Sequence, residues 1–319
     1  MLRHNLPDWA HWRAQDADGT WWAYEVEPLQ HFTGWYENEV GQCVRIDKEQ
    51  ANPQWQTTLS KIVSVKPKKN LLIAEETHWA KVEVWQSDSI RSLYLHDDIA
   101  IQSQLDLAQK HQLLKQYSRA MMSFLLFKSQ PKSLLLFGLG GGSIIHFLHH
   151  WFPQLAIQAV DINERIIAIA KQYFELPEVP QINIHNCDAA SFLENTPLKN
   201  QDVILIDLHD GQSLPEFLSK SDFLTQCHQA LSAEGVLVFN LLIQQEQDFL
   251  PIMLALRQSF TATSLCLSLK NDQNIIVLAF KSPQSIDMIE LQQRASECQE
   301  KYAIEFEQFV ASLTIIGAK

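Results

Sequence analysis

A glycine-rich loop is the sharpest chemical motif in the sequence. It follows a short apolar run, residues 134–137, and a helical pattern begins directly after it. Glycine lets the backbone turn tightly and approach a ligand, and the start of a helix offers unpaired N–H donors. Because such loops also arise for packing reasons, the motif alone leaves both interpretations open. The glycines that would face a ligand are Gly138, Gly140, Gly141 and Gly142.

Three aspartates follow successive predicted strands in the same part of the chain. Asp161 ends the second strand, Asp188 follows the third and Asp207 ends the fourth. In a parallel sheet these strand ends open onto one edge, where ligands bind. There Asp161 can accept hydrogen bonds from both ribose hydroxyls, and Asp188 can accept one from an adenine amino group. Each acid could instead be a helix N-cap, but the succession beside the glycine loop predicts a nucleoside pocket.

The elements that position these residues alternate between strands and helices. Continuous apolar strands between amphipathic helices indicate a parallel sheet covered on both faces. Two later runs, 264–269 and 274–281, lie close together and predict a closing antiparallel hairpin. We therefore predict an α/β, Rossmann-like fold of the S-adenosylmethionine-dependent methyltransferase type, with a seven-stranded, mostly parallel sheet and a C-terminal antiparallel hairpin. The parallel strands are expected at residues 133–137, 156–160, 181–185, 203–206 and 236–242.

Three parts are predicted along the chain. Residues 1–60 hold most of the tryptophans between turn signals, which predicts a small tryptophan-rich β module. Residues 61–110 contain four short strand-like runs and predict an antiparallel β unit. Residues 111–319, which open with a helical pattern at 111–128, form the nucleoside-binding catalytic domain. A protein partner for the first module and a homodimer of the chain both stay open.

Charge and cysteine usage narrow the classes of partner. Lys+Arg number 25 against 37 Asp+Glu, for a net charge of -12, and such a field repels the phosphate backbone of nucleic acids. The chain has no apolar run near the roughly 18 residues of a membrane span, and its first residues lack the apolar core of a signal peptide. The 5 cysteines are widely spaced, which favours reduced thiols and a cytoplasmic location.

Three histidines lie on one face of the helix predicted after the glycine loop. They are His146, His149 and His150, whose spacing is compatible with metal ligation. No paired carboxylate motif accompanies them, so we interpret them as a solvated helix face and expect no metal.

Over residues 70–280 the sequence resembles the spermidine/spermine synthase family, the polyamine aminopropyltransferases, as a divergent member. The β unit, the glycine loop and the ordered acids occur in that family's order, and residues 98–102 are similar to a family strand that ends in Gln. The resemblance implies that Gln102, Asp161 and Asp188 contact the nucleoside.

The same resemblance assigns the reacting residues. Asp207 stands where the family has its catalytic aspartate, and Asp210 stands where a polyamine-binding aspartate is found. Tyr117, on the predicted helix, belongs to the same catalytic group. The co-substrate implied is decarboxylated S-adenosylmethionine, or S-adenosylmethionine itself, and the acceptor is a small amine or polyamine.

Three positions and one loop depart from the family pattern. Gly141 replaces an acid that holds the aminopropyl ammonium, and Arg119 replaces a substrate-facing acid. Asn240 takes the place of a Gln, and a Pro-rich loop before the last hairpin strand is missing. These changes leave the function open between aminopropyl transfer to an amine, as the leading hypothesis, methyl transfer from S-adenosylmethionine, and nucleoside binding without turnover.

Overall fold

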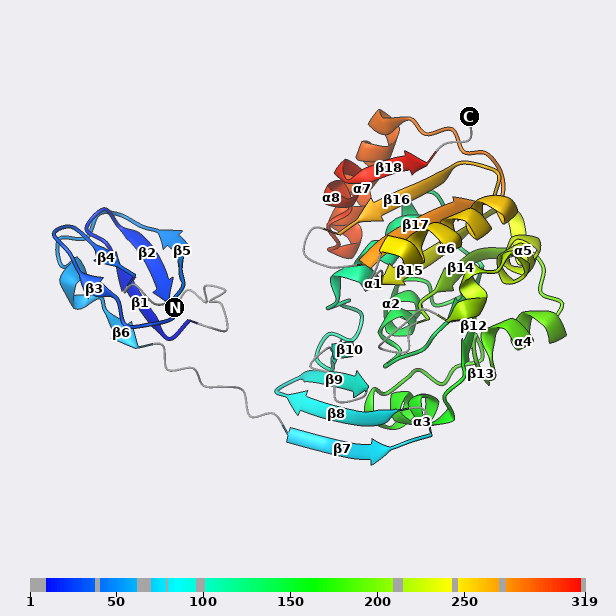
Figure 1. Ribbon diagram of the computed structural model, residues 1–319, viewed down its shortest axis with the longest axis horizontal. Coiled ribbons are helices and arrows are strands. Elements are labelled where there is room, and N and C mark those ends of the chain that lie inside the picture. The colour runs from blue at the N-terminus through cyan, green and yellow to red at the C-terminus, as the bar shows by residue number, and fades with distance from the viewer. Residues whose placement is uncertain are drawn as a thin grey trace. The chain divides into compact units, whose positions relative to one another are not determined.

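The strand that leads into the glycine loop, β11 (Ser133–Phe137), lies inside an eight-stranded sheet with the order β13-β12-β11-β14-β15-β17-β16-β18. A computed structural model describes residues 10–37, 41–61, 70–78, 80–95, 101–208, 215–242, 246–269 and 274–316 (Figure 1). The strands β11 to β15 run parallel, while β17 and β16 are antiparallel. The other strands are β12 (Ala156–Asp161), β13 (Ile182–Asn186), β14 (Gln201–Ile206), β15 (Leu231–Leu242), β16 (Ser264–Ser268), β17 (Asn274–Phe280) and β18 (Leu313–Ile316).

Helices cover both faces of this sheet because the strands are apolar on both sides. On one face, Leu134 and Leu136 pack into a cluster with α1 (Gln116–Met121), α2 (Ser143–Trp151), α7 (Met288–Tyr302) and α8 (Phe306–Ala311). On the other, Leu135 and Phe137 pack with α4 (Ala189–Asn195), α5 (Ser221–Ala230) and α6 (Glu246–Ser259). Full burial of each such side chain stabilises the fold by about 1.5–3 kcal/mol before chain entropy is subtracted.

The predicted α/β fold is confirmed, with two differences in detail. The sheet has an eighth strand, because β18 pairs with β16 beyond the predicted seven. Its run of only four residues, Leu313–Ile316, is too short for its periodicity to identify it. The helix expected at 111–128 is instead α1 followed by a 3-10 helix, η2 (Met122–Leu126).

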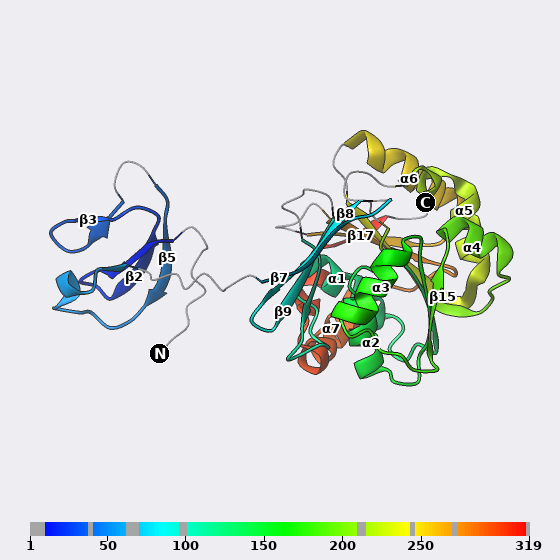
Figure 2. The same ribbon diagram turned by 90° about the horizontal axis from the view of Figure 1, so that it is seen from below.

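A second sheet precedes the main one, with the order β10-β9-β8-β7. One of its faces lies against α3 (Glu164–Tyr173) (Figure 2). The two pack through a cluster that includes Val84, Leu93 and Ile169. Arg165 of α3 forms a two-pronged ion pair with Glu75 of β7, with N···O distances of 2.5 and 2.7 Å. These strands are β7 (Asn70–Glu76), β8 (Lys81–Ser87), β9 (Ile90–Leu95) and β10 (Ile101–Asp106).

The tryptophan-rich segment forms its own sheet, with the order β5-β2-β1-β6. Asp16 links this sheet to a small hairpin that contains Trp35. Its carboxylate accepts from the Trp35 backbone N–H at 2.7 Å and from the Trp22 indole N–H at 2.8 Å. The Trp22 indole is thus bound within the module, and Trp55 is buried in it. Its elements are β1 (Trp12–Gln15), β2 (Thr20–Tyr24), β3 (Leu29–Gln30), β4 (Trp35–Tyr36), β5 (Cys43–Lys48), η1 (Trp55–Thr57) and β6 (Ser60–Lys61).

The chain divides into two units, Met1–Lys68 and Lys69–Lys319. The second unit contains both the β7–β10 sheet and the main sheet. The finer division into 1–60, 61–110 and 111–319 stays a prediction. Among the described residues, no helix is long and apolar enough to span a bilayer.

Candidate functional site

The glycine loop needs glycine for its backbone geometry. Gly138, Gly140 and Gly142 have φ values of +91°, +51° and +77°, a region that other residues rarely adopt. Space is also limiting: a Cβ on Gly138 would lie 2.1 Å from the Asp207 carbonyl oxygen, and one on Gly142 would lie 2.4 Å from Leu176 Cδ1. The loop is therefore held close to the end of β14, and Gly142 precedes the first turn of α2.

Gly141 is confined by side chains rather than by its backbone. A Cβ there would lie 2.9 Å from Ser103 Oγ and 2.9 Å from Phe174 Cδ1. Ser103 belongs to β10, so the β7–β10 sheet contributes a side chain that lies beside the glycine loop. The position where the family resemblance expects an acid thus has no room for a side chain unless these neighbours move.

Asp161 holds the glycine loop from the end of β12. Its Oδ2 accepts from the Leu139 N–H at 2.9 Å, and its Oδ1 accepts from the Asn163 N–H at 2.9 Å. Burial raises the pKa of this carboxyl, and the N–H groups of Asn163, Leu139 and Gly140 oppose that rise. A carboxylate has about four acceptor positions, so these bonds leave capacity for ligand hydroxyls.

Asp188 is the N-cap of α4, as the alternative interpretation of this residue allowed. Its Oδ1 accepts from the Ser191 N–H at 2.9 Å. The side chain is half-buried just beyond the end of β13. The cap occupies one carboxylate oxygen and fixes the side chain at the same sheet edge as Asp161.

Asp207 follows β14 and takes part in a chain of three side chains. Asn240 Nδ2 donates to Asp207 Oδ1 at 2.8 Å, and Asn274 Nδ2 donates to Asn240 Oδ1 at 2.7 Å. Both asparagines are buried, at 6% and 7% exposure. Burial raises the pKa of Asp207 to about 6, against the opposing effect of the Asn240 hydrogen bond. The carboxylate is therefore oriented and a stronger base than an ordinary aspartate.

Successive side chains of a strand point to opposite faces of the sheet, and this alternation decides on which face Asp207 and its two asparagine neighbours lie. Val203 and Leu205 of β14 belong to the cluster with α1, and Asp207 continues that series. Tyr117 of α1 packs against the same cluster. Its hydroxyl donates to the Gln102 carbonyl oxygen at 3.3 Å. The structure thus brings β10, α1 and the end of β14 together around the glycine loop.

Arg119, the basic residue that stands where the family has an acid, donates hydrogen bonds to other residues of this protein. Its Nε and Nη2 donate to Glu305 at 2.8 Å, and its Nη1 donates to the carbonyl oxygens of Leu113 and Leu114 at 3.1 and 2.8 Å. The guanidinium therefore fastens the segment before α1 to the turn between α7 and α8. Its role is structural, which its sequence position did not indicate.

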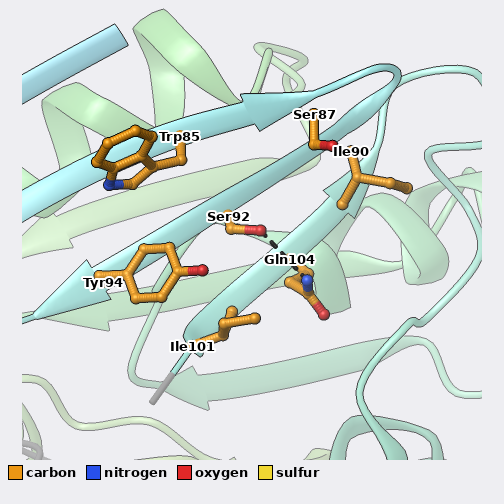
Figure 3. A pocket seen from close by; sticks show the side chains of 7 residues that line it. All are labelled: Trp85, Ser87, Ile90, Ser92, Tyr94, Ile101 and Gln104. Atoms are coloured by element: carbon orange, nitrogen blue, oxygen red, sulfur yellow. Dashed lines mark hydrogen bonds between the residues drawn. The ribbon is translucent and has the colours of Figure 1, made fainter. Parts of the chain in front are cut away.

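A pocket lies on the β7–β10 sheet, on the face that points away from α3. Trp85, Tyr94 and Ile101 surround a hydrogen bond of 3.2 Å from Gln104 Nε2 to Ser92 Oγ (Figure 3). Its residues alternate with those that pack on α3, such as Val84 and Leu93. None of the predicted site residues lines this pocket.

Two further predictions concern histidines and the residues after Asp207. His146 is buried at 6% exposure, and its Nε2 lies 2.8 Å from the Phe174 carbonyl oxygen, so the interpretation of it as part of a solvated helix face is wrong. The described part of the chain holds no group of three or more His, Cys, Asp or Glu side chains suited to a metal. Asp210, to which the resemblance assigns polyamine binding, lies outside the described residues.

The architecture defines the class of protein. A mostly parallel sheet with a glycine loop after β11, acids after the neighbouring strands and a closing antiparallel hairpin is the Rossmann-like fold of spermidine synthases and methyltransferases. A probable spermidine synthase from Corynebacterium glutamicum superposes with a TM-score of 0.61 at 16% identity, covering 72% of this chain and 93% of its own. Human Methyltransferase-like protein 13, in complex with SAH, gives 0.55 at 23% identity, covering 59% and 93%.

The sequence comparison identifies the family within this class. Residues 114–264 match the model of the spermine/spermidine synthase domain. The polyamine aminopropyltransferase of Chromobacterium violaceum is 36% identical over 237 residues, which cover 73% of this chain and 89% of that relative. The chain belongs to the spermine/spermidine synthase family.

Proposed function

We propose that this chain transfers an aminopropyl group from decarboxylated S-adenosylmethionine to a small amine or polyamine. The observation that carries the proposal is Asp207, a shielded carboxylate at the sheet edge that Asn240 orients at 2.8 Å. Family membership supports the class of reaction, since relatives such as that of Chromobacterium violaceum are polyamine aminopropyltransferases. The glycine loop, Asp161, Asp188 and Gln102 would hold the nucleoside.

The reaction needs an oriented amine and a base. The lone pair of the acceptor nitrogen attacks the aminopropyl carbon next to the sulfonium, the new C–N bond forms, and the C–S bond breaks. Its electron pair goes to sulfur, which leaves as the neutral thioether methylthioadenosine. The amine must lose a proton, and in this proposal the Asp207 carboxylate takes it. Because the leaving group is neutral, no general acid is required.

Tyr117 and Asp210 complete the proposed acceptor side. Tyr117 lies on α1, on the face of the sheet that continues to Asp207, and can line the path of the amine. Asp210 would add negative charge for a second ammonium of a polyamine.

Methyl transfer from S-adenosylmethionine is a second candidate, which Gly141 favours. The space where an acid would anchor the aminopropyl ammonium is filled by Ser103 and Phe174. The same in-line geometry would then present the methyl carbon to an acceptor.

The experiment supplies purified protein with decarboxylated S-adenosylmethionine plus putrescine, and separately with S-adenosylmethionine plus the same amine. Formation of methylthioadenosine and an aminopropylated amine in the first reaction supports the proposal. A methylated amine and S-adenosylhomocysteine in the second reaction alone would establish the methyl-transfer alternative. Binding of methylthioadenosine without product from either donor would identify a binding protein.

A further inference from the structure

We propose that Asn274 is a positioning residue for transfer, which acts through Asn240 to fix the direction of the Asp207 carboxylate. The inference rests on the proposed function of Asp207. It adds a residue from β17, a strand that contributes none of the predicted site residues. Asn274 is separated from Asp207 by one intervening side chain, so it is a supporting residue rather than a catalytic one.

The sheet register explains why the three side chains meet. Ile206 pairs with Phe239 in the parallel β14–β15 ladder, so the next residues, Asp207 and Asn240, are neighbours. In the antiparallel β15–β17 ladder Asn240 pairs with Ile276, and Asn274 lies diagonally beside it. Diagonal neighbours on one sheet face lie within reach of each other's side chains.

Because the site is buried, the orientation of the Asn240 amide between Asp207 and Asn274 affects its free energy. The Asn240 amide has one acceptor and two donors, and either end could face Asp207. In the structure the Asn274 NH₂ donates to the Asn240 oxygen at 2.7 Å, and the Asn240 amide presents its own NH₂ to the carboxylate at 2.8 Å. The reverse orientation would place a carbonyl oxygen against Asp207 and an unpaired donor group against Asn274. Such unsatisfied groups are costly in a buried site.

The same arrangement has a catalytic consequence. Asp207 is attached to rigid β14, but its carboxyl can still rotate about the side-chain bonds. A donor fixed at Oδ1 restricts this rotation and so fixes the direction in which Oδ2 points. A small misplacement of a reacting group can cost roughly 10²-fold in rate. We therefore expect Asn274 to influence turnover without influencing nucleoside binding.

The test compares Asn274→Ala with Ile276→Val. Ile276 is buried in the same strand and faces the same cluster, but it has no hydrogen-bonding side chain. We expect Asn274→Ala to lower kcat with the amine about 10- to 100-fold, while the Kd for methylthioadenosine and the KM for the donor stay close to the wild-type values. Ile276→Val should retain the wild-type kcat.

A double variant tests whether Asn274 acts through Asn240. If it does, Asn274→Ala should cause no further loss of kcat in an Asn240→Ala background. Multiplicative losses would overturn the proposal, as would a kcat for Asn274→Ala equal to that of Ile276→Val. Should Asn274→Ala fail to fold, Asn274→Ser keeps a polar residue that is too short to reach the Asn240 oxygen.

A readout that does not depend on turnover separates this proposal from the proposed function. Hydrogen exchange of the Asn240 side-chain NH₂, measured by NMR, should be slow in the wild type and faster in Asn274→Ala. Unchanged exchange would overturn the positioning role even if the enzyme is active. Absence of product from the wild type, with exchange altered as expected, would instead overturn the proposed function and leave Asn274 as the residue that orients Asn240.

Discussion

The N–H of Asp207 donates to the carbonyl oxygen of Phe137 at 2.8 Å. This bond joins the residue before the glycine loop to the predicted catalytic carboxylate, across the β11–β14 ladder. The start of the glycine loop and Asp207 are therefore held together by the backbone hydrogen bonds of the sheet. If the loop holds the donor as proposed, this bond sets the distance between the donor and the Asp207 carboxylate.

Asp207→Asn should abolish most of the transfer activity. Asparagine keeps the shape and can still accept from Asn240, but it cannot take a proton, so kcat should fall by about 10²–10⁴-fold. The affinity for methylthioadenosine, measured by calorimetry, should change little. Asp202→Asn is the matched control, because Asp202 lies at the opposite end of β14 and pairs with Lys128 at 3.1 Å. Equal loss of kcat in both variants would contradict the catalytic role.

The same substitution should increase stability at neutral pH. Burial raises the pKa of Asp207 to about 6 from the ordinary value of 3.8, so the folded protein disfavours the charged form. Such a group adds stability that is fully present below pH 3.8 and lost as the pH rises through 6. The cost above pH 6 is about 3 kcal/mol, at 1.36 kcal/mol per unit. Denaturant unfolding of both proteins between pH 4 and 8 should show Asp207→Asn gaining relative stability as pH rises. A pH-independent difference would contradict the raised pKa.

Asp161→Ala should weaken nucleoside binding and loosen the glycine loop. The change removes the acceptor for the Leu139 N–H, and with it the proposed acceptor for the ribose hydroxyls. Affinity for methylthioadenosine should fall by roughly 2–3 kcal/mol, since hydrogen bonds to a charged group carry that order. Asp161→Asn, which keeps an acceptor oxygen, should lose less. Wild-type affinity in Asp161→Ala would show that the nucleoside binds elsewhere.

Gly141→Ala should destabilise the protein through crowding. The φ of Gly141 is not among the positive values, so the effect comes from the 2.9 Å contacts with Ser103 and Phe174. Overpacking of this kind costs about 1–3 kcal/mol in unfolding free energy. Adding Ser103→Ala should recover part of the loss, because it removes one of the two contacts. Thermal unfolding checks both variants, and an unchanged midpoint for Gly141→Ala would show that its neighbours adapt freely.

Arg119→Ala should lower the stability of the folded protein. The change leaves the Glu305 carboxylate and two carbonyl oxygens without their donor, in a site where the two side chains are 24% and 21% exposed. The expected loss is about 2–3 kcal/mol, below the roughly 3–5 of a fully buried pair. Arg119→Lys should recover only part, since an ammonium lacks the planar fork. Additive losses in a double variant with Glu305→Ala would show that the pair does not interact.

Local pattern by itself determined the main architecture of this protein. The alternation of apolar strands with helices predicted the Rossmann-like fold, because burial on both faces requires continuous apolar strands. The glycine loop and the positions of Asp161, Asp188 and Asp207 after their strands were also evident, since turns and strand ends are properties of neighbouring residues. The family resemblance came from the order of these motifs.

Tertiary structure alone decided what surrounds those motifs. Asn274 reaches Asp207 through Asn240 only because two ladders, one parallel and one antiparallel, set their register. Arg119 meets Glu305, and Ser103 fills the space beside Gly141, through contacts between segments far apart in the chain. Such pairings depend on the distances between packed elements, which no local pattern of residues encodes. The orientation and basicity of Asp207 are therefore properties of the folded sheet.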